Sequence, residues 1–112
     1  MVELMTQTEL SRETRVIKGK VDEASAFLKK LANRDRLLVV CALVEGEKSV
    51  RELEDLLDIR QPGLSQQLAE LRAASMIAGR KEGKAVFYSL ADPKVKAIIG
   101  TMYDLFCRPD AD

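Results

Sequence analysis

The sequence contains no histidine and no tryptophan, and its aromatic residues are three Phe and two Tyr. Without histidine, the chain lacks the commonest general acid–base group and the commonest ligand of transition metals in proteins. We therefore expect no catalytic residue, no metal site, no cofactor and no enzymatic activity. No apolar run approaches the roughly 20 residues that a membrane-spanning helix needs, so we also expect no membrane partner.

An excess of charge of one sign is absent as well, because 18 Lys and Arg residues balance 18 Asp and Glu residues. DNA-binding domains are often basic overall, so a net charge of zero counts against DNA binding. The distribution is uneven, however, since residues 60–84 hold five cations and two anions, a local net charge of +3. A hydrophobic share of 46% and a charged share of 32% in 112 residues fit one globular domain.

Cysteine is scarce, and the two examples are Cys41 and Cys107. Residues 1–15 are polar and lack the apolar segment of a signal peptide, which predicts a cytoplasmic protein. Two cysteines in a reducing compartment rarely form a permanent structural disulfide. Their residue type leaves three roles open: buried apolar side chains, ligands, or a redox pair.

Three segments are expected along the chain. Residues 1–15 are polar and aperiodic, which predicts a flexible N-terminal arm, and residues 109–112 form a short C-terminal tail. Residues 16–108 are expected to form one domain for DNA binding and dimerisation. Most of its apolar residues recur at three- and four-residue intervals, which predicts helices at about 14–31 and 34–44.

Short sequence signals mark further helix ends. Asn33 is expected to end the first helix, because Asn is common at helix C-termini. Ser49, with Glu52 three residues later, has the pattern of a capping box that opens a third helix, which ends near Asp58. Pro62 fits the first turn of a fourth helix. A short helix, a turn and a second helix predict a helix-turn-helix.

After the fourth helix the apolar pattern changes to alternation. Residues 86–90 alternate and predict a strand, and residues 77–81 are its expected partner. Gly83 lies in the turn between them, where it tolerates a positive φ. Asp92 followed by Pro93 predicts the start of a last helix that reaches about Phe106. The expected fold is mainly α with a small β-hairpin: a winged helix-turn-helix in the order α-α-α-α-β-β-α.

This architecture predicts binding to double-stranded DNA. The second helix of a helix-turn-helix lies in the major groove, with its N-terminal residues towards the base edges. Gln suits adenine, Ser contacts a base or a phosphate, and Arg or Lys on the helix and the wing contact phosphates. The predicted DNA-binding residues are Arg60, Gln61, Gly63, Ser65, Gln66, Gln67, Arg72, Arg80, Lys81 and Lys84.

The first and last helices have strong apolar faces outside the helix-turn-helix. These faces either complete one core or pair with a second copy of the chain. In a two-fold homodimer the recognition helices lie about 34 Å apart, which matches a palindromic operator. The candidate interface residues are Phe27, Leu31, Ile98, Met102 and Tyr103.

With these elements in place, the sequence resembles the ArsR/SmtB family of winged-helix repressors over about residues 21–106. The matching stretches are residues 31–37, 50–53, 61–71 and 80–90. The resemblance implies a homodimer that represses transcription and leaves its operator when an inducer binds. It also implies that the first and last helices form the dimer interface.

The sequence departs from the family at its common metal sites. Many metal-sensing members carry Cys-Val-Cys at the start of the third helix, where this chain has Ser49, Val50 and Arg51. Others bind zinc through Asp and His on the last helix, where Asp92 remains but Lys94 stands in place of His. Both common metal sites are therefore missing.

The resemblance implies a specific role for the two cysteines. In the family fold the second and last helices pack against each other, and Cys41 and Cys107 lie on these two helices. Such a pair is similar to that of the persulfide-sensing subfamily, the repressors of the biofilm growth-associated type. The resemblance implies that reactive sulfur species bridge the two cysteines through a di- or polysulfide and cause release from the operator. Exchange requires a thiolate, so at least one cysteine is expected to have a lowered pKa or to be accessible.

Other functions remain open at this point. Two thiolates also suit arsenite or a soft metal ion, and a general thiol-redox repressor needs no specific sulfur donor. A thiol peroxidase is an enzymatic alternative, although the chain lacks Cys-x-x-Cys and a histidine to activate the thiol. A winged helix that binds protein is the alternative that the neutral net charge favours.

Overall fold

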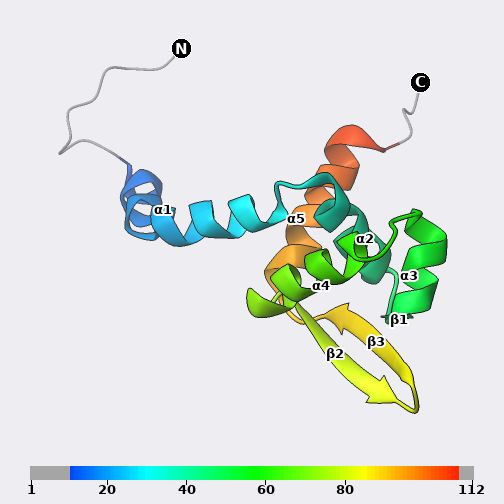
Figure 1. Ribbon diagram of the computed structural model, residues 1–112. Helices are drawn as coiled ribbons and strands as arrows, with labels where there is room; N and C mark the ends of the chain where they lie inside the picture. Colours follow the sequence, from blue (N-terminus) through cyan, green and yellow to red (C-terminus); the bar gives the residue numbers. More distant parts are fainter. Residues whose placement is uncertain (1–10, 109–112) are drawn as a thin grey trace.

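The computed structural model describes residues 11–108 (Figure 1). The predicted order of helices and hairpin is confirmed, with one additional short strand. The elements are α1 (Arg12–Leu31), α2 (Arg34–Val44), β1 (Lys48–Ser49), α3 (Val50–Leu57), α4 (Gly63–Ala73), β2 (Ile77–Glu82), β3 (Ala85–Leu90) and α5 (Pro93–Phe106). In the described part of the chain, no helix is long and apolar enough to cross a membrane.

Helix α1 begins earlier than the sequence pattern predicts. The Ser11 hydroxyl accepts a hydrogen bond from the Thr14 N–H at 3.1 Å, so it caps the helix at Arg12. Residues 12–15, which the sequence pattern places in the arm, are therefore helical, because an N-cap supplies an acceptor for orphan N–H groups without any apolar pattern. The remainder of the predicted arm, residues 1–10, and the predicted tail, residues 109–112, lie outside the described residues.

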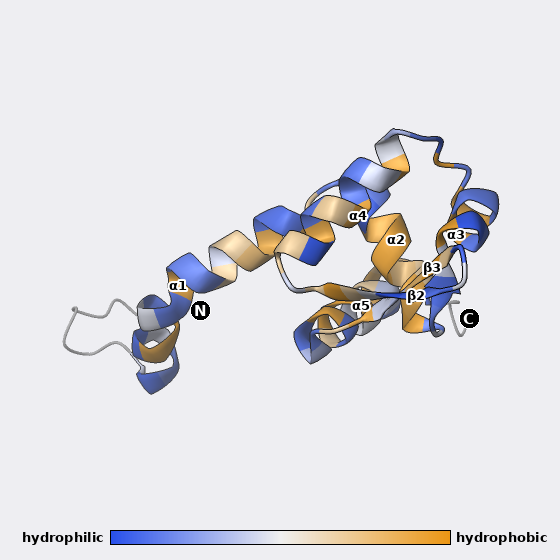
Figure 2. Cartoon of the chain, turned by 60° about the horizontal axis from the view of Figure 1, so that its bottom comes forward, coloured by the Kyte–Doolittle hydropathy of each residue, from blue (hydrophilic) through white to orange (hydrophobic). Residues whose placement is uncertain are grey.

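Helix α1 extends away from the rest of the molecule, and its C-terminal end joins the body (Figure 1). Figure 2 shows apolar and polar residues alternating along this extended helix. Leu31 is its one buried residue, with 4% of its surface exposed. Most of the apolar residues of α1 are therefore not covered by the chain's own core.

Asn33 caps the start of α2 rather than the end of α1. Its side-chain oxygen accepts a hydrogen bond from the Arg36 N–H at 3.0 Å, and its φ of −155° is extended. The prediction that Asn33 ends α1 is wrong, because that role needs a left-handed backbone and an N-cap needs an extended one. The other capping signals are confirmed: Ser49 and Glu52 form the capping box of α3, and Asp92 caps α5.

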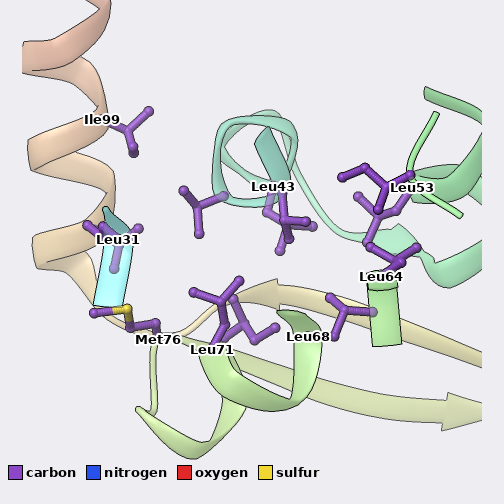
Figure 3. Packing of buried hydrophobic residues seen from close by; sticks show 13 residues of the cluster. Leu31, Leu43, Leu53, Leu64, Leu68, Leu71, Met76 and Ile99 are labelled. Carbon is purple, nitrogen blue, oxygen red and sulfur yellow. The ribbon is translucent and has the colours of Figure 1, made fainter. Parts of the chain in front are cut away.

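The core is built around α2, whose neighbours are α1, α3, α4, α5 and β3. Residues 37–44 of α2 are apolar almost without interruption, which is typical of a helix covered on several sides. Figure 3 shows side chains from the surrounding helices converging around this helix. The buried residues are Leu31, Val39, Val40, Leu43, Leu53, Ile59, Leu64, Leu68, Leu71, Met76, Ile77, Val95 and Ile99.

The wing is the antiparallel pair β2–β3, in register from Ile77 opposite Leu90 to Glu82 opposite Ala85. The turn is shorter than predicted, because Glu82 belongs to β2 and only residues 83–84 connect the strands. Gly83 has the expected positive φ, at 63°. Strand β1 adds to the other edge of β3 and joins the wing to the start of α3. Two residues are too few for a periodic pattern, so β1 is not predictable from the sequence.

Two leucines of α3 provide a matched test of how this helix is held. Leu53 is fully buried, whereas Leu56 on the same helix is 61% exposed. We expect Leu53→Ala to lower the free energy of unfolding by about 2–5 kcal/mol, because it leaves a cavity in the core. We expect Leu56→Ala to change it by less than about 0.5 kcal/mol. Urea denaturation of both variants measures the difference, and equal effects would contradict this packing.

Candidate nucleic-acid interface and thiol pair

Helix α4 has one face in the core and one face exposed. Leu64, Leu68 and Leu71 are buried, while Ser65, Gln66 and other polar residues on the opposite side are exposed. The short helix α3 precedes it, and the connection includes Asp58 in a left-handed conformation. This arrangement is that of a helix-turn-helix with α4 as the recognition helix.

Gln61 and Ser65 are held together at the start of α4. The Gln61 side-chain oxygen accepts hydrogen bonds from the Ser65 N–H at 3.0 Å and from the Ser65 hydroxyl at 2.6 Å. Pro62 occupies the N-cap position without a side-chain cap bond, one residue before the predicted place, so Gln61 satisfies an orphan N–H of the helix instead. Both residues are exposed, and these two hydrogen bonds hold their side chains together at the start of the helix.

Gln67 lies apart from the other predicted base-contacting residues. Its side-chain oxygen accepts a hydrogen bond from Arg36 Nε at 2.7 Å, and the residue is half-buried. Gln67 therefore faces α2, whereas Gln66 is exposed on the outer side of α4. The prediction from the sequence does not separate these two glutamines. Their side chains project about 100° apart around the helix, and packing decides which of the two faces solvent.

Two shallow clefts flank β3 on the side of the molecule where α3, α4 and the wing meet. One lies between α4 and the wing and is lined in part by Ser65, Arg72 and Tyr88. The other lies between α3 and the end of the wing and includes Arg51 and Lys84. Arg51 is not among the predicted DNA-binding residues. Its place in the first turn of α3, the first helix of the helix-turn-helix, is the feature of the sequence that could have indicated it.

Arg80, one of the wing cations predicted to contact phosphates, does not lie at the tip of the wing. It lies within β2 opposite Phe87, and its guanidinium stacks over that ring at 4.8 Å from the centroid. Two of its nitrogens donate to the two oxygens of Glu47 at 2.8 and 2.7 Å, and a third donates to Glu82 at 2.7 Å. These hydrogen bonds raise the pKa of Arg80, and the bond from Arg80 lowers the pKa of Glu47.

The partners of Arg80 change its expected role. Two carboxylates bind its guanidinium, so Arg80 is available to a phosphate only if it gives up these bonds. Its contacts instead anchor β2 to the segment before β1. Lys81 and Lys84 are exposed, and within residues 11–108 no ion pair joins either of them to a carboxylate. Of the predicted cations of the wing, these two therefore remain the candidates for phosphate contact.

Cys41 and Cys107 line one cavity between α2 and α5, with a volume of about 920 Å³. Both cysteines are free and exposed, so the interpretation of Cys41 as a buried core residue is wrong. Desolvation by the apolar surroundings raises the pKa of the Cys41 thiol, and the charge of Cys107 raises it further. The expected accessibility is therefore present, and the expected lowering of the pKa does not occur at Cys41.

The walls of this cavity are mostly apolar. They include Leu37 and Val44 from α2 and Ile99, Met102 and Phe106 from α5. Cys107 is the C-cap residue of α5, where its N–H donates to the Tyr103 carbonyl at 2.8 Å. The tertiary structure thus brings together two thiols that are far apart in the sequence.

The candidate dimer-interface residues differ in exposure. Leu31 belongs to the core of the single chain and is only 4% exposed, so it has little surface to offer a partner. Phe27 and Ile98 are partly buried against the core, Met102 is half-buried, and Tyr103 is 52% exposed. Further large apolar residues, outside the list of predicted interface residues, are exposed on α1 and α5: Val16, Ile17, Val21, Leu28, Leu105 and Phe106.

Comparison with known proteins gives this arrangement a family. The model of the family "Bacterial regulatory protein, arsR family" matches residues 33–78. The biofilm growth-associated repressor of Agrobacterium fabrum is 40% identical over 114 residues, which cover 96% of this chain and 97% of the relative.

Solved structures agree with this match. The crystal structure of the transcriptional repressor BigR from Xylella fastidiosa has a TM-score of 0.81 and 39% identity, and the match covers 89% of this chain and all of that one. Reduced HlyU from Vibrio cholerae has a TM-score of 0.78 and 38% identity, covering 84% and 99% of the two chains. The chain therefore belongs to the arsR family of bacterial regulatory proteins, as a winged-helix DNA-binding transcriptional repressor and not an enzyme.

Proposed function

We propose that this repressor acts as a homodimer on a palindromic operator and releases it when reactive sulfur species bridge Cys41 and Cys107. The observation that carries the proposal is the shared cavity of the two thiols between α2 and α5. Both thiols are exposed, so a small sulfur donor reaches them from solvent.

The DNA-binding mode follows from the exposed face of α4. Ser65 and Gln66 face the major groove, with Gln61 holding the start of the helix. Gly63 supports a close approach, since a Cβ at this position would have no atom within 4 Å. The phosphate contacts are assigned to Arg51, Arg60, Arg72, Lys81 and Lys84.

Dimerisation is supported by the unburied apolar residues of α1 and α5. Helix α1 has 20 residues, yet only Leu31 is buried, and isolated helices of this kind are rarely stable in water. A second copy of the same chain covers such a surface in a two-fold arrangement, which a palindromic operator matches.

The sulfur chemistry needs one sulfane sulfur donor, such as a hydrogen polysulfide. One thiolate attacks the donor, an S–S bond of the donor breaks, and the cysteine becomes a persulfide while a shorter sulfide leaves. The second thiolate attacks the cysteine-bound sulfur of this persulfide and expels hydrosulfide. The two thiols lose two electrons and form a disulfide, and the sulfane sulfur is reduced to hydrogen sulfide. If both cysteines are first persulfidated, the same attack leaves a bridge of three sulfurs.

The bridge acts on DNA binding through α2. A disulfide holds two Cα atoms about 5.5–6 Å apart, so it constrains α5 against α2. Helix α2 packs against both α5 and the recognition helix α4. A change at the α2–α5 contact therefore alters the spacing and orientation of the two recognition helices in the dimer. The two helices then no longer fit both half-sites of the operator.

The cysteine variants test this switch. We expect Cys41→Ser and Cys107→Ser each to bind a duplex selected by the wild-type protein, but not to release it with polysulfide. Fluorescence anisotropy measures release, and intact mass identifies the bridged chain with its number of added sulfurs. A peroxide-treated sample is the control for general oxidation, and an arsenite-treated sample for metalloid binding. Normal release by either single variant would contradict the two-cysteine switch.

The raised pKa of Cys41 has a measurable consequence. In Cys107→Ser, we expect the rate of Cys41 alkylation by iodoacetamide to keep rising with pH beyond about 8.5, the usual pKa of a thiol. In the wild-type protein the midpoint should lie higher still, because the Cys107 thiolate disfavours a second negative charge nearby. A midpoint at or below the usual pKa in Cys107→Ser would contradict this environment.

The salt dependence of binding tests the phosphate contacts. Each phosphate that a cation neutralises adds about one to the slope of log affinity against log salt. We therefore expect Arg72→Ala and Lys84→Ala each to reduce the slope by about two in a dimer. Lys20→Ala is the matched control, because Lys20 lies on α1 beside Glu23 and away from this surface. An unchanged slope in both test variants would remove these residues from the interface.

A further inference from the structure

Four polar residues meet where α1, α2 and α4 come together, and we call them the junction cluster: Lys30, Arg36, Gln67 and Glu70. Arg36 Nε donates to the Gln67 side-chain oxygen at 2.7 Å, and Arg36 Nη1 donates to the Lys30 carbonyl at 3.2 Å. Lys30 Nζ donates to Glu70 Oε1 at 2.8 Å. The cluster thus joins the end of α1 and the start of α2 to the recognition helix.

Arg36 is the fixed centre of this cluster. Its backbone N–H is bound by the Asn33 cap, and only 19% of its side chain is exposed. The carbonyl of Lys30 is one of the orphan acceptors in the last turn of α1, where a cation is favoured by the helix dipole. A planar guanidinium with bonds in two directions therefore sets the distance between the end of α1 and α4.

Gln67 is the receiving residue on α4. It borders the buried stripe of Leu64, Leu68 and Leu71, and it is half-buried. To reach a base edge, its oxygen must give up a bond to a charged donor that is largely shielded from water. Such bonds are stronger than bonds between neutral groups, so Gln67 stays with Arg36.

Glu70 provides a second contact one turn further along α4. The hydrogen bond and the charge of Lys30, together with the charge of Arg36, lower the pKa of Glu70. Its side chain is 49% exposed, so the ion pair adds little stability by itself. Its effect is to keep the one carboxylate of the recognition helix beside a cation of α1 and away from DNA phosphates.

We propose that Arg36 is a positioning residue that sets the rotation of α4 about its axis through Gln67. Base reading is thereby left to Ser65 and Gln66, and Gln67 serves the scaffold. The same residue ties the recognition helix to α1, the helix that is proposed to dimerise. This inference rests on the DNA-binding function and adds the residue that orients it.

The test compares specific with non-specific binding. The wild-type protein selects a duplex from a randomised pool, and anisotropy gives the dissociation constants for this duplex and for a scrambled one. Arg36→Lys keeps the positive charge but loses the planar guanidinium that bonds in two directions. Gln67→Leu removes the side-chain oxygen that accepts from Arg36, while Arg36 keeps its bond to the Lys30 carbonyl. Arg34→Lys is the matched control, because the side chain of Arg34 is 81% exposed and pairs with the adjacent Asp35.

We expect Arg36→Lys and Gln67→Leu each to reduce the ratio of specific to non-specific affinity by about tenfold, in keeping with the loss of one charge-assisted hydrogen bond. The double variant should lose no more than the larger single effect, because both changes break the same bond. Affinity for the scrambled duplex and its salt dependence should stay unchanged, since phosphate contacts are not involved. Circular dichroism confirms that each variant is folded, and Gln67→Leu carries the test if Arg36→Lys does not fold.

Three results overturn the proposal in distinguishable ways. A wild-type ratio in both Arg36→Lys and Gln67→Leu excludes a positioning role while the DNA-binding function stands. Loss of specificity in Gln67→Leu alone, with a changed base preference at one position, identifies Gln67 as a base reader. Selection of no duplex by the wild-type protein contradicts both the DNA-binding function and the role of Arg36.

Discussion

The burial of α2 is the constraint on which the rest of the structure depends. Its apolar residues point in nearly every direction, so other elements must cover it on several sides. Val39, Val40 and Leu43 are buried, and α1, α3, α4, α5 and β3 all contact this helix. The recognition helix α4 and helix α5, which Cys107 directly follows, are thus positioned by packing against one common element.

This shared helix also carries one residue of the proposed positioning contact and one of the proposed thiol switch. Arg36 in its first turn holds Gln67 of α4, and Cys41 lines the cavity shared with Cys107. The two positions are five residues apart, which turns them about 140° from each other around the helix. Helix α2 therefore borders both the recognition helix and the thiol cavity, so the proposed switch needs no long chain of intermediates.

Ion pairs between cations and carboxylates, rather than an excess of cations, determine which charges are free near the helix-turn-helix. Arg80 is bound to Glu47 and Glu82, and Lys30 is bound to Glu70, so several cations near the helix-turn-helix already have partners. Lys84 and Arg72 line clefts beside the wing without such a partner among the described residues. The carboxylates of Glu47, Glu70 and Glu82 are thereby held by scaffold cations, which lets a protein of zero net charge present cations beside the wing that are unpaired within residues 11–108.

The elements with local signals were predictable from the amino-acid sequence. Capping residues, apolar spacing and a glycine turn predicted α3, α5, the wing and the helix-turn-helix, because these features depend on residues within a few positions of one another. Which polar residues are free to act depends instead on tertiary packing. It paired Arg80 with Glu47, turned Gln67 towards Arg36, buried Leu31 and brought Cys41 and Cys107 to one cavity. Each of these outcomes joins residues from separate elements, and their contacts exist only after the elements pack around α2.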